Sequence, residues 1–218
     1  MSHTKQYTII VNPVFAEIAE KGSKFIAYIF PVQDGQEIKN QIQKIKILHP
    51  KARHWCYAWR LGQLSDSFKS SDDGEPSGTA GKPILNQIDS ANLINTLIVV
   101  VRYFGGALLG TSGLIKAYKE AAKKSIETAT LVAFEPTIKY LFQSNAAKIQ
   151  TLLSILKEFE IPIHNYTIAE ESSILFQLPL DKEEMYFRKI KSKLEKLNAS
   201  QIENPMLFKD CTIKVIND

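Results

Sequence analysis

The chain has 218 residues, of which 44 per cent are hydrophobic and 23 per cent are charged, the composition of an ordinary folded protein with a core of its own. The net charge of +4 is mild, and the two cysteines, Cys56 and Cys211, lie far apart without CxxC spacing, which argues against a disulfide framework or a zinc site. Because the start MSHTKQYTII is unlike a secretory signal and the run LIVVV is too short to span a bilayer, we expect a cytoplasmic protein that makes no membrane contact.

The first part of the chain mixes strand and helix patterns. Alternating and β-branched segments predict two strands within 15–32 around a turn at Lys21–Gly22, an aromatic-rich strand over 54–62, and a strand over 94–104 that is buried on both faces. Apolar residues at helical spacing predict helices over 37–48 and 110–129.

The second part predicts strands at 135–144, 161–170, 172–180 and 211–216 and helices at 146–159 and 181–197, the last opening with a capping box from Asp181 to Glu184. The order β-α-β-β-α-β is the ferredoxin-like pattern. We therefore expect an α+β protein with two domains, residues 1–133 and 134–218. The first has 16 Lys and Arg against 11 Asp and Glu, so the basic excess of the chain lies there.

A glycine-rich loop, RYFGGALLGTSGLIKAY (102–118), joins the buried strand to the second helix. Gly105 and Gly106 let another group approach the backbone, and free N–H groups at a helix start near Thr111 suit an anion. Arg102 would add donors, so a phosphate or carboxylate cradle is one interpretation. A tight strand-to-helix connection that needs glycine only for its geometry is the other.

An acidic loop, SSDDGEPSGTAGKPIL (70–85), lies between elements of the same domain, so it is not an interdomain linker. We expect an ordered loop with Asp72, Asp73 and Glu75 at its tip. These carboxylates suit a divalent metal site, acid–base chemistry or an acceptor surface for basic groups of a partner, and composition alone also allows a solvated acidic turn.

His54 starts the aromatic strand, where it could act as a general base or bind an anion, although packing beside Trp55 and Tyr57 is the commoner role. Trp55, Tyr57 and Trp59 share one face of this strand, which favours a core role over base stacking. Ser77 and Thr79 are hydroxyls near carboxylates, but no nucleophile–base pair is visible.

The two loops together, SDDGEPSGTAGKPIL and VVVRYFGGALLGTSGLIKAY, preceded by ARHWCYAWRLG, resemble the YigZ/IMPACT family over essentially the whole chain. The resemblance implies a first domain like the β-α fold shared by a small-subunit ribosomal protein, part of elongation factor G and the GHMP kinases. It implies a ferredoxin-like second domain similar to a C-terminal domain of elongation factor G. Eukaryotic IMPACT relatives regulate translation-linked stress signalling by binding proteins, and they lack this second domain.

In this family both loops belong to the signature and form one surface. The signature falls on His54, Asp72, Asp73, Gly74, Glu75, Pro76, Ser77, Gly78, Thr79, Ala80, Gly81, Pro83, Arg102, Tyr103, Phe104, Gly105, Gly106, Gly110 and Gly113. Leu108 stands where the family commonly has lysine, and Ser112 where it has glycine, which removes one cation beside the anion cradle.

We therefore expect a binding or regulatory protein that acts on RNA, the ribosome or a translation-linked protein partner, without a cofactor. The alternative is an enzyme acting on an anionic or phosphorylated small molecule with a divalent metal. The predicted ligand-binding residues are His54, Asp72, Asp73, Glu75, Ser77, Thr79, Arg102, Tyr103, Gly105, Gly106, Gly110 and Thr111.

Overall fold

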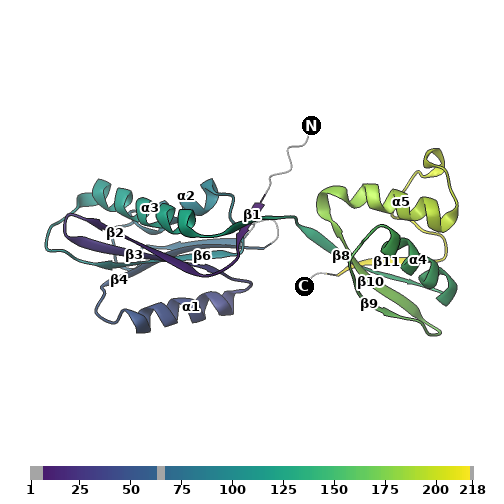
Figure 1. Ribbon diagram of the computed structural model, residues 1–218, viewed down its shortest axis with the longest axis horizontal. Helices are drawn as coiled ribbons and strands as arrows, with labels where there is room; N and C mark the ends of the chain where they lie inside the picture. Colours follow the sequence, from purple (N-terminus) through teal and green to yellow (C-terminus); the bar gives the residue numbers. More distant parts are fainter. Residues whose placement is uncertain (1–6, 63–66, 217–218) are drawn as a thin grey trace. The chain divides into compact units, whose positions relative to one another are not determined.

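The computed structural model describes residues 7–62 and 67–216. The chain divides into two compact units, the first ending at Phe134 and the second beginning at Glu135. Both units mix helices with antiparallel sheets, as expected for an α+β protein (Figure 1).

The first unit is built on a five-stranded antiparallel sheet in the order β2-β3-β6-β4-β5. The strands are β2 (Val14–Glu20), β3 (Ser23–Pro31), β4 (His54–Leu61), β5 (Ser67–Ser71) and β6 (Thr96–Tyr103). The predicted turn between β2 and β3 is confirmed, and both Lys21 (φ 45°) and Gly22 (φ 78°) have positive φ, as a two-residue hairpin turn requires. The β-branched strand β6 is central and buried along nearly its whole length, as its sequence predicts.

Helices cover both faces of this sheet (Figure 1). On one face α1 (Gly35–Leu48) begins at Asp34, whose carboxylate accepts hydrogen bonds from two backbone N–H groups. On the other face lie α2 (Gly81–Ser90) and α3 (Gly110–Thr128). Alternation along β6 separates two cores, because Ile98 and Val100 pack under α2 and α3 whereas neighbouring side chains pack under α1.

Four elements of the first unit, β5, α2, β1 and β7, are not predicted by the sequence patterns. Strand β5 is mostly exposed and rich in serine, so it lacks an apolar alternation. Helix α2 has no side-chain hydrogen bond from its own N-cap residue. A short pair joins β1 (Tyr7–Ile10) to β7 (Leu131–Phe134), so Phe134 belongs to the first unit, whereas the sequence prediction places it in the second.

The second unit contains β8 (Thr137–Ser144), α4 (Ala146–Glu158), β9 (Ile163–Thr167), β10 (Ser172–Pro179), α5 (Glu183–Glu195) and β11 (Thr212–Ile216). Its antiparallel sheet has the order β11-β8-β10-β9. A separate aromatic core forms around Tyr140, Phe142, Phe176 and Phe187.

The predicted capping box of α5 is wrong. Asp181 lies inside a short 3₁₀ turn, η1 (Leu180–Lys182), and α5 starts after Lys182 without a side-chain cap. The 3₁₀ turn takes the place of the extended residue that a capping box needs. A second 3₁₀ turn, η2 (Ala199–Gln201), precedes β11. Across the two described ranges, no helix combines the length and the apolar character needed to cross a bilayer.

Candidate functional site

Four loops of the first unit meet at one end of its sheet and form what we call the loop junction. They are the β2–β3 turn, the segment before β4, the acidic loop after β5 and the glycine-rich loop after β6. The strand register sets His54, at the start of β4, opposite Arg102, near the end of β6, and sets Lys24, after the β2–β3 turn, opposite Tyr103. The acidic loop, which follows β5, and the glycine-rich loop, which follows β6, therefore reach the same end. The structure brings the two predicted segments together.

Asp72 folds the acidic loop around its carboxylate. Its Oδ2 accepts a hydrogen bond from the N–H of Gly78 at 2.9 Å, and its Oδ1 accepts from the N–H groups of Ala80 and Gly81 at 2.9 and 2.8 Å. Burial alone would raise the pKa of this carboxyl, but the three N–H donors hold the pKa below its usual value. Asp72 thus caps α2 from outside the helix.

Asp73 fastens the same loop to the start of β4. Its Oδ2 accepts from the backbone N–H of Trp55 at 2.8 Å, and Lys46 of α1 lies 3.6 Å from its Oδ1. The ring of His54 hydrogen bonds through Nδ1 to the carbonyl oxygen of Asp73 at 2.9 Å. Because a carbonyl only accepts, Nδ1 is the donor, and His54 serves here to orient the loop.

Glu75 turns inward and forms a buried ion pair with Arg102. The Oε1 atom of Glu75 accepts from Arg102 Nη1 and from the Tyr118 hydroxyl, both at 2.7 Å. The two charged side chains are only 3% and 7% exposed. The guanidinium carbon of Arg102 also lies 5.5 and 5.7 Å from the ring centres of Phe25 and Phe104, within the range of cation–π attraction. The ion pair links the acidic loop to β6, and the hydrogen bond from Tyr118 links it to α3.

Cys56 and Tyr118 complete the buried network, and sequence reasoning missed both. The Cys56 sulfur lies 2.9 Å from the carbonyl oxygen of Asp72 and 3.3 Å from the Tyr118 hydroxyl. Burial raises the pKa of each group well above its usual range, so neither ionises near neutral pH. The sequence did contain a signal for both. Cys56 lies two positions after His54 and so shares its face of β4. The Tyr118 hydroxyl lies on a buried helix face, where it needs a hydrogen-bond partner.

Gly105 packs directly on the β2–β3 turn. A Cβ atom added to Gly105 would lie 1.9 Å from the carbonyl carbon of Gly22. The N–H of Gly105 donates to the Ser23 hydroxyl at 3.2 Å. Gly105 is therefore required for close packing between two loops, which supports the geometric interpretation of the glycine-rich loop.

The start of α3 is open to solvent. Thr111 is exposed, and the residue before the helix, Leu109, provides no side-chain cap. Gly106 (φ 89°) and Gly110 (φ 69°) have positive φ, which shapes the approach of the chain to the helix. The first turn contains no acidic residue, so its N–H groups could receive an anion.

Of the remaining predicted residues, Ser77 and Thr79 lie in the acidic loop, whereas Tyr103 lies on the face of the sheet that α1 covers. Ser77 is exposed, whereas Thr79 is buried and its hydroxyl donates to the carbonyl oxygen of Pro76 at 2.6 Å. Tyr103 points to the face covered by α1, where its hydroxyl lies 2.9 Å from Nδ1 of His49. Tyr103 is thus separated from the Glu75–Arg102 pair by the alternation of the strand.

The three carboxylates of the acidic loop are all bound by groups of the protein itself. Within residues 7–62 and 67–216, no group of three or more His, Cys, Asp or Glu side chains has an arrangement that could hold a metal ion. The arrangement is that of a rigid loop junction, with exposed backbone and hydroxyl groups on its outer side.

Known proteins share this part of the chain. Residues 21–126 match the model of the Impact N-terminal domain. The IMPACT family member YigZ of Escherichia coli is 34% identical over 163 residues, which make up 74% of this chain and 80% of YigZ. The chain belongs to the IMPACT family. The IMPACT match contains every loop of the junction described above.

Another IMPACT family member, YvyE of Bacillus subtilis, is 44% identical over 110 residues, about half of each chain. A crystal structure described as that of a hypothetical protein is similar to the full chain, with a TM-score of 0.66 at 28% identity. This match covers 97% of the present chain and 96% of the other. The similarity to solved structures therefore extends over both units.

Proposed function

We propose that this IMPACT family protein is a cytoplasmic regulatory binding protein that acts on RNA, either free or on the ribosome, through the loop junction of its first unit. A translation-linked role follows from the family resemblance. The proposed ligand-binding groups are the exposed ones at the junction, including Ser77, Gly106 and Thr111, and the phosphate backbone is the part of RNA that they would contact.

The observation that carries this proposal is that the acidic side chains of the junction are already paired within the protein. Asp72 accepts hydrogen bonds from backbone N–H groups, Asp73 accepts one from a backbone N–H group and has Lys46 nearby, and Glu75 forms an ion pair with Arg102. Their neighbours on the loops at this end, Lys21, Lys51 and Arg53, are exposed. The junction therefore offers cations and N–H donors outward, while its carboxylates are paired with groups of the protein itself, which suits a polyanion.

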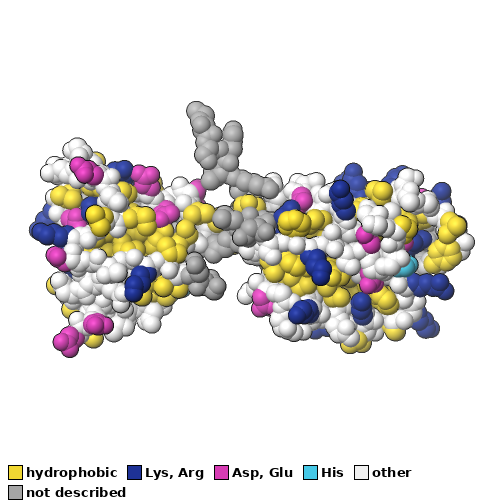
Figure 2. Space-filling view, turned by 180° about the vertical axis from the view of Figure 1, so that it is seen from behind, with side chains coloured by type: hydrophobic (Ala, Val, Ile, Leu, Met, Phe, Trp, Pro, Cys, Tyr) yellow, Lys and Arg dark blue, Asp and Glu magenta, His cyan; other side chains and the backbone are white. Residues whose placement is uncertain are grey.

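Surface charge supports the same proposal. Lys and Arg side chains are spread over the visible face of the first unit, on the right in Figure 2. Residues up to 133 carry a net charge of +5, whereas the rest carry −1. We infer that the first unit makes the main electrostatic contact with RNA.

The second unit is proposed to be a ferredoxin-like domain related to a C-terminal domain of elongation factor G. Support comes from its order of elements and from the sheet order β11-β8-β10-β9, in which α4 joins β8 to β9 across β10 and α5 joins β10 to β11 across β8. Such a domain would help to position the protein on a ribosome, by analogy of fold.

The enzyme alternative has less support. It needs at least one carboxylate that can bind a metal or exchange a proton. Glu75 is buried against Arg102, and both oxygens of Asp72 accept backbone hydrogen bonds. We therefore do not propose a reaction.

The test is a salt titration of binding to a fluorescent single-stranded RNA, measured by anisotropy. The logarithm of the affinity should fall linearly with the logarithm of the salt concentration. Replacing Arg53 by alanine should reduce this slope by about 1, because one phosphate contact is lost. Lys44 is exposed on α1, so Lys44→Ala is the matched control and should leave the slope unchanged. Absence of binding at low salt would contradict the RNA proposal.

A further inference from the structure

A groove runs between α2 and α3 on the face of the sheet opposite α1, and it encloses about 420 Å³. This volume is in the range of small binding sites in proteins. The groove is lined by Pro83, Asn86, Gln87, Asp89, Ser90, Ile115 and Lys119. Pro83 and Ile115 come from the ends of the acidic and glycine-rich segments, but they lie on α2 and α3. No lining residue takes part in the hydrogen bonds or the ion pair of the loop junction, so the groove is a second surface beside it.

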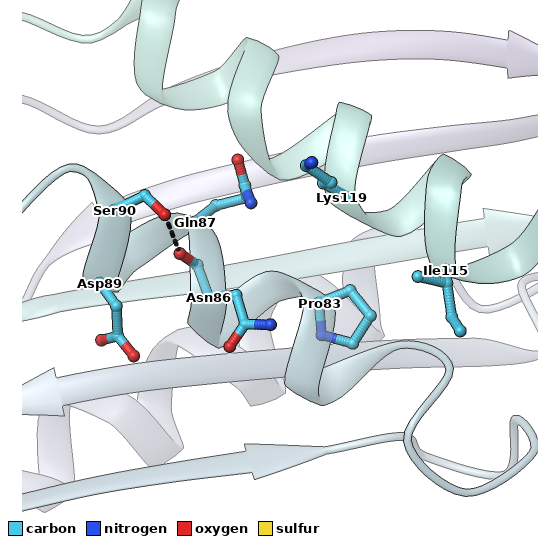
Figure 3. Close-up of a pocket in the computed structure, with 7 residues that line it drawn as sticks. All are labelled: Pro83, Asn86, Gln87, Asp89, Ser90, Ile115 and Lys119. Atoms are coloured by element: carbon cyan, nitrogen blue, oxygen red, sulfur yellow. Dashed lines mark hydrogen bonds between the residues drawn. The ribbon is translucent and has the colours of Figure 1, made fainter.

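The groove changes in chemistry along its length (Figure 3). Pro83 and Ile115 lie at one end, Gln87 and Lys119 in the middle, and Asp89 at the other end. Ile115 is 42% exposed although it is a large apolar side chain. An apolar end next to a cation and side-chain amides offers separate contacts to apolar, anionic and amide groups of one ligand.

The charge of the groove is positive. Its one carboxylate, Asp89, is neutralised by an ion pair with Arg60 of β4. Lys119 is exposed in the groove and Lys116 is exposed on the same helix, with one exposed acidic residue between Lys116 and the next turn, Glu120. Lys123, one turn further, is exposed but forms an ion pair with Glu127. A ligand complementary to this surface is anionic.

The residue types favour a polypeptide over a nucleic acid. Unpaired bases are usually held by stacking on aromatic side chains, and the lining contains no aromatic residue. The amides of Asn86 and Gln87 each carry donors and acceptors that match a peptide backbone. The Ser90 hydroxyl donates at 2.7 Å to the backbone carbonyl oxygen of Asn86, so this hydrogen bond does not use the side-chain amide of Asn86.

We propose that the groove between α2 and α3 binds an extended acidic segment of a partner protein. An apolar side chain of that segment packs between Pro83 and Ile115, and a carboxylate pairs with Lys119. This interaction is independent of RNA binding at the loop junction, so either can fail alone.

The test uses the full ¹⁵N-labelled chain and a short synthetic peptide of repeating Glu-Glu-Leu. Peptide addition should shift the amide resonances of α2 and α3 and leave those of the second unit in place. Lys119→Glu and Ile115→Ser should each weaken the affinity by about fivefold or more, since each removes one direct contact. Lys123→Glu makes the same charge change one turn further along α3 and should weaken binding less than twofold.

The amide spectra of the variants also show whether each remains folded. An unperturbed α2–α3 surface at saturating peptide would overturn the proposal. Equal weakening by Lys119→Glu and Lys123→Glu would also overturn it, because binding would then follow net charge alone. The proposal would also be overturned if oligouridine, and not the peptide, bound the groove and Lys119→Glu weakened that binding.

Discussion

Asp72 shows how a single carboxylate organises the acidic loop. Its two oxygens collect three backbone N–H groups from residues six, eight and nine positions later in the chain. A loop closed in this way keeps few alternative conformations, which explains how the acidic loop stays ordered although it contains several glycines. Both oxygens of the carboxylate hold the loop, so a side chain with only one acceptor oxygen cannot replace it.

We predict that Asp72→Asn destabilises the protein by about 1–2 kcal/mol, because the amide nitrogen replaces one acceptor and faces an N–H donor. The folded-state pKa of Asp72 is lowered, so its contribution is fully present above the ordinary value of 3.8 and is lost as the pH falls through the lower folded value. Urea unfolding at several pH values measures this difference between the two proteins.

The difference in unfolding free energy should be constant from neutral pH to about 4 and should shrink at lower pH. A difference that is near zero at neutral pH, or that grows as the pH falls, would contradict the capping role of Asp72.

The identity of the candidate residues was accessible from the sequence, but the direction of their side chains was not. Composition leaves a metal site, acid–base chemistry, an acceptor surface for basic groups and a solvated turn all open for three neighbouring carboxylates. The inward direction of Glu75 depends on Arg102 and Tyr118, which are 27 and 43 residues away. Tyr103 looks equivalent to Arg102 in a motif, yet alternation along β6 sends it to the other face.

At the scale of elements, periodicity predicts the long helices and the central strand well. Helix α2 is missed because its cap comes from Asp72, far from the position where a local N-cap is expected. Strand β5 is missed because it is an exposed edge strand that contributes little to the core. At Asp181 the error is of another kind. The sequence contains the capping-box motif there, but a 3₁₀ turn forms in place of the box.

The contact between the glycine-rich loop and the β2–β3 turn gives a test at this scale. Gly105→Ala should cost about 3 kcal/mol or more, because the new methyl group would meet the backbone of Gly22, which cannot move aside as a side chain can. Gly35 at the start of α1 has open space around it, so Gly35→Ala should change stability by less than about 0.5 kcal/mol. Thermal and urea unfolding compare the two variants.

Similar stabilities for Gly105→Ala and Gly35→Ala would show that the two loops do not pack as closely as described. The comparison is matched because both substitutions add the same methyl group.

At the scale of the whole molecule, the chain contains two units with separate cores. The first unit packs two cores against its five-stranded sheet, and the second has its own aromatic cluster. Each unit buries enough apolar surface to be expected to fold without the other.

We therefore predict that fragments 1–134 and 135–218 each fold when expressed alone. Each should unfold cooperatively in urea, and its amide resonances should largely overlay those of the full chain away from the cut. A fragment that gives a collapsed spectrum without dispersion would show that the units depend on each other.

The buried ion pair between Glu75 and Arg102 can be tested by a double-mutant cycle, read by urea unfolding. If the buried pair joins the two loops, Glu75→Leu and Arg102→Leu should each cost about 3–5 kcal/mol by leaving a buried charge without its partner. The double variant should then cost at least about 2 kcal/mol less than the sum of the two. Additive costs, within about 0.5 kcal/mol, would contradict the buried ion pair and the loop junction built on it.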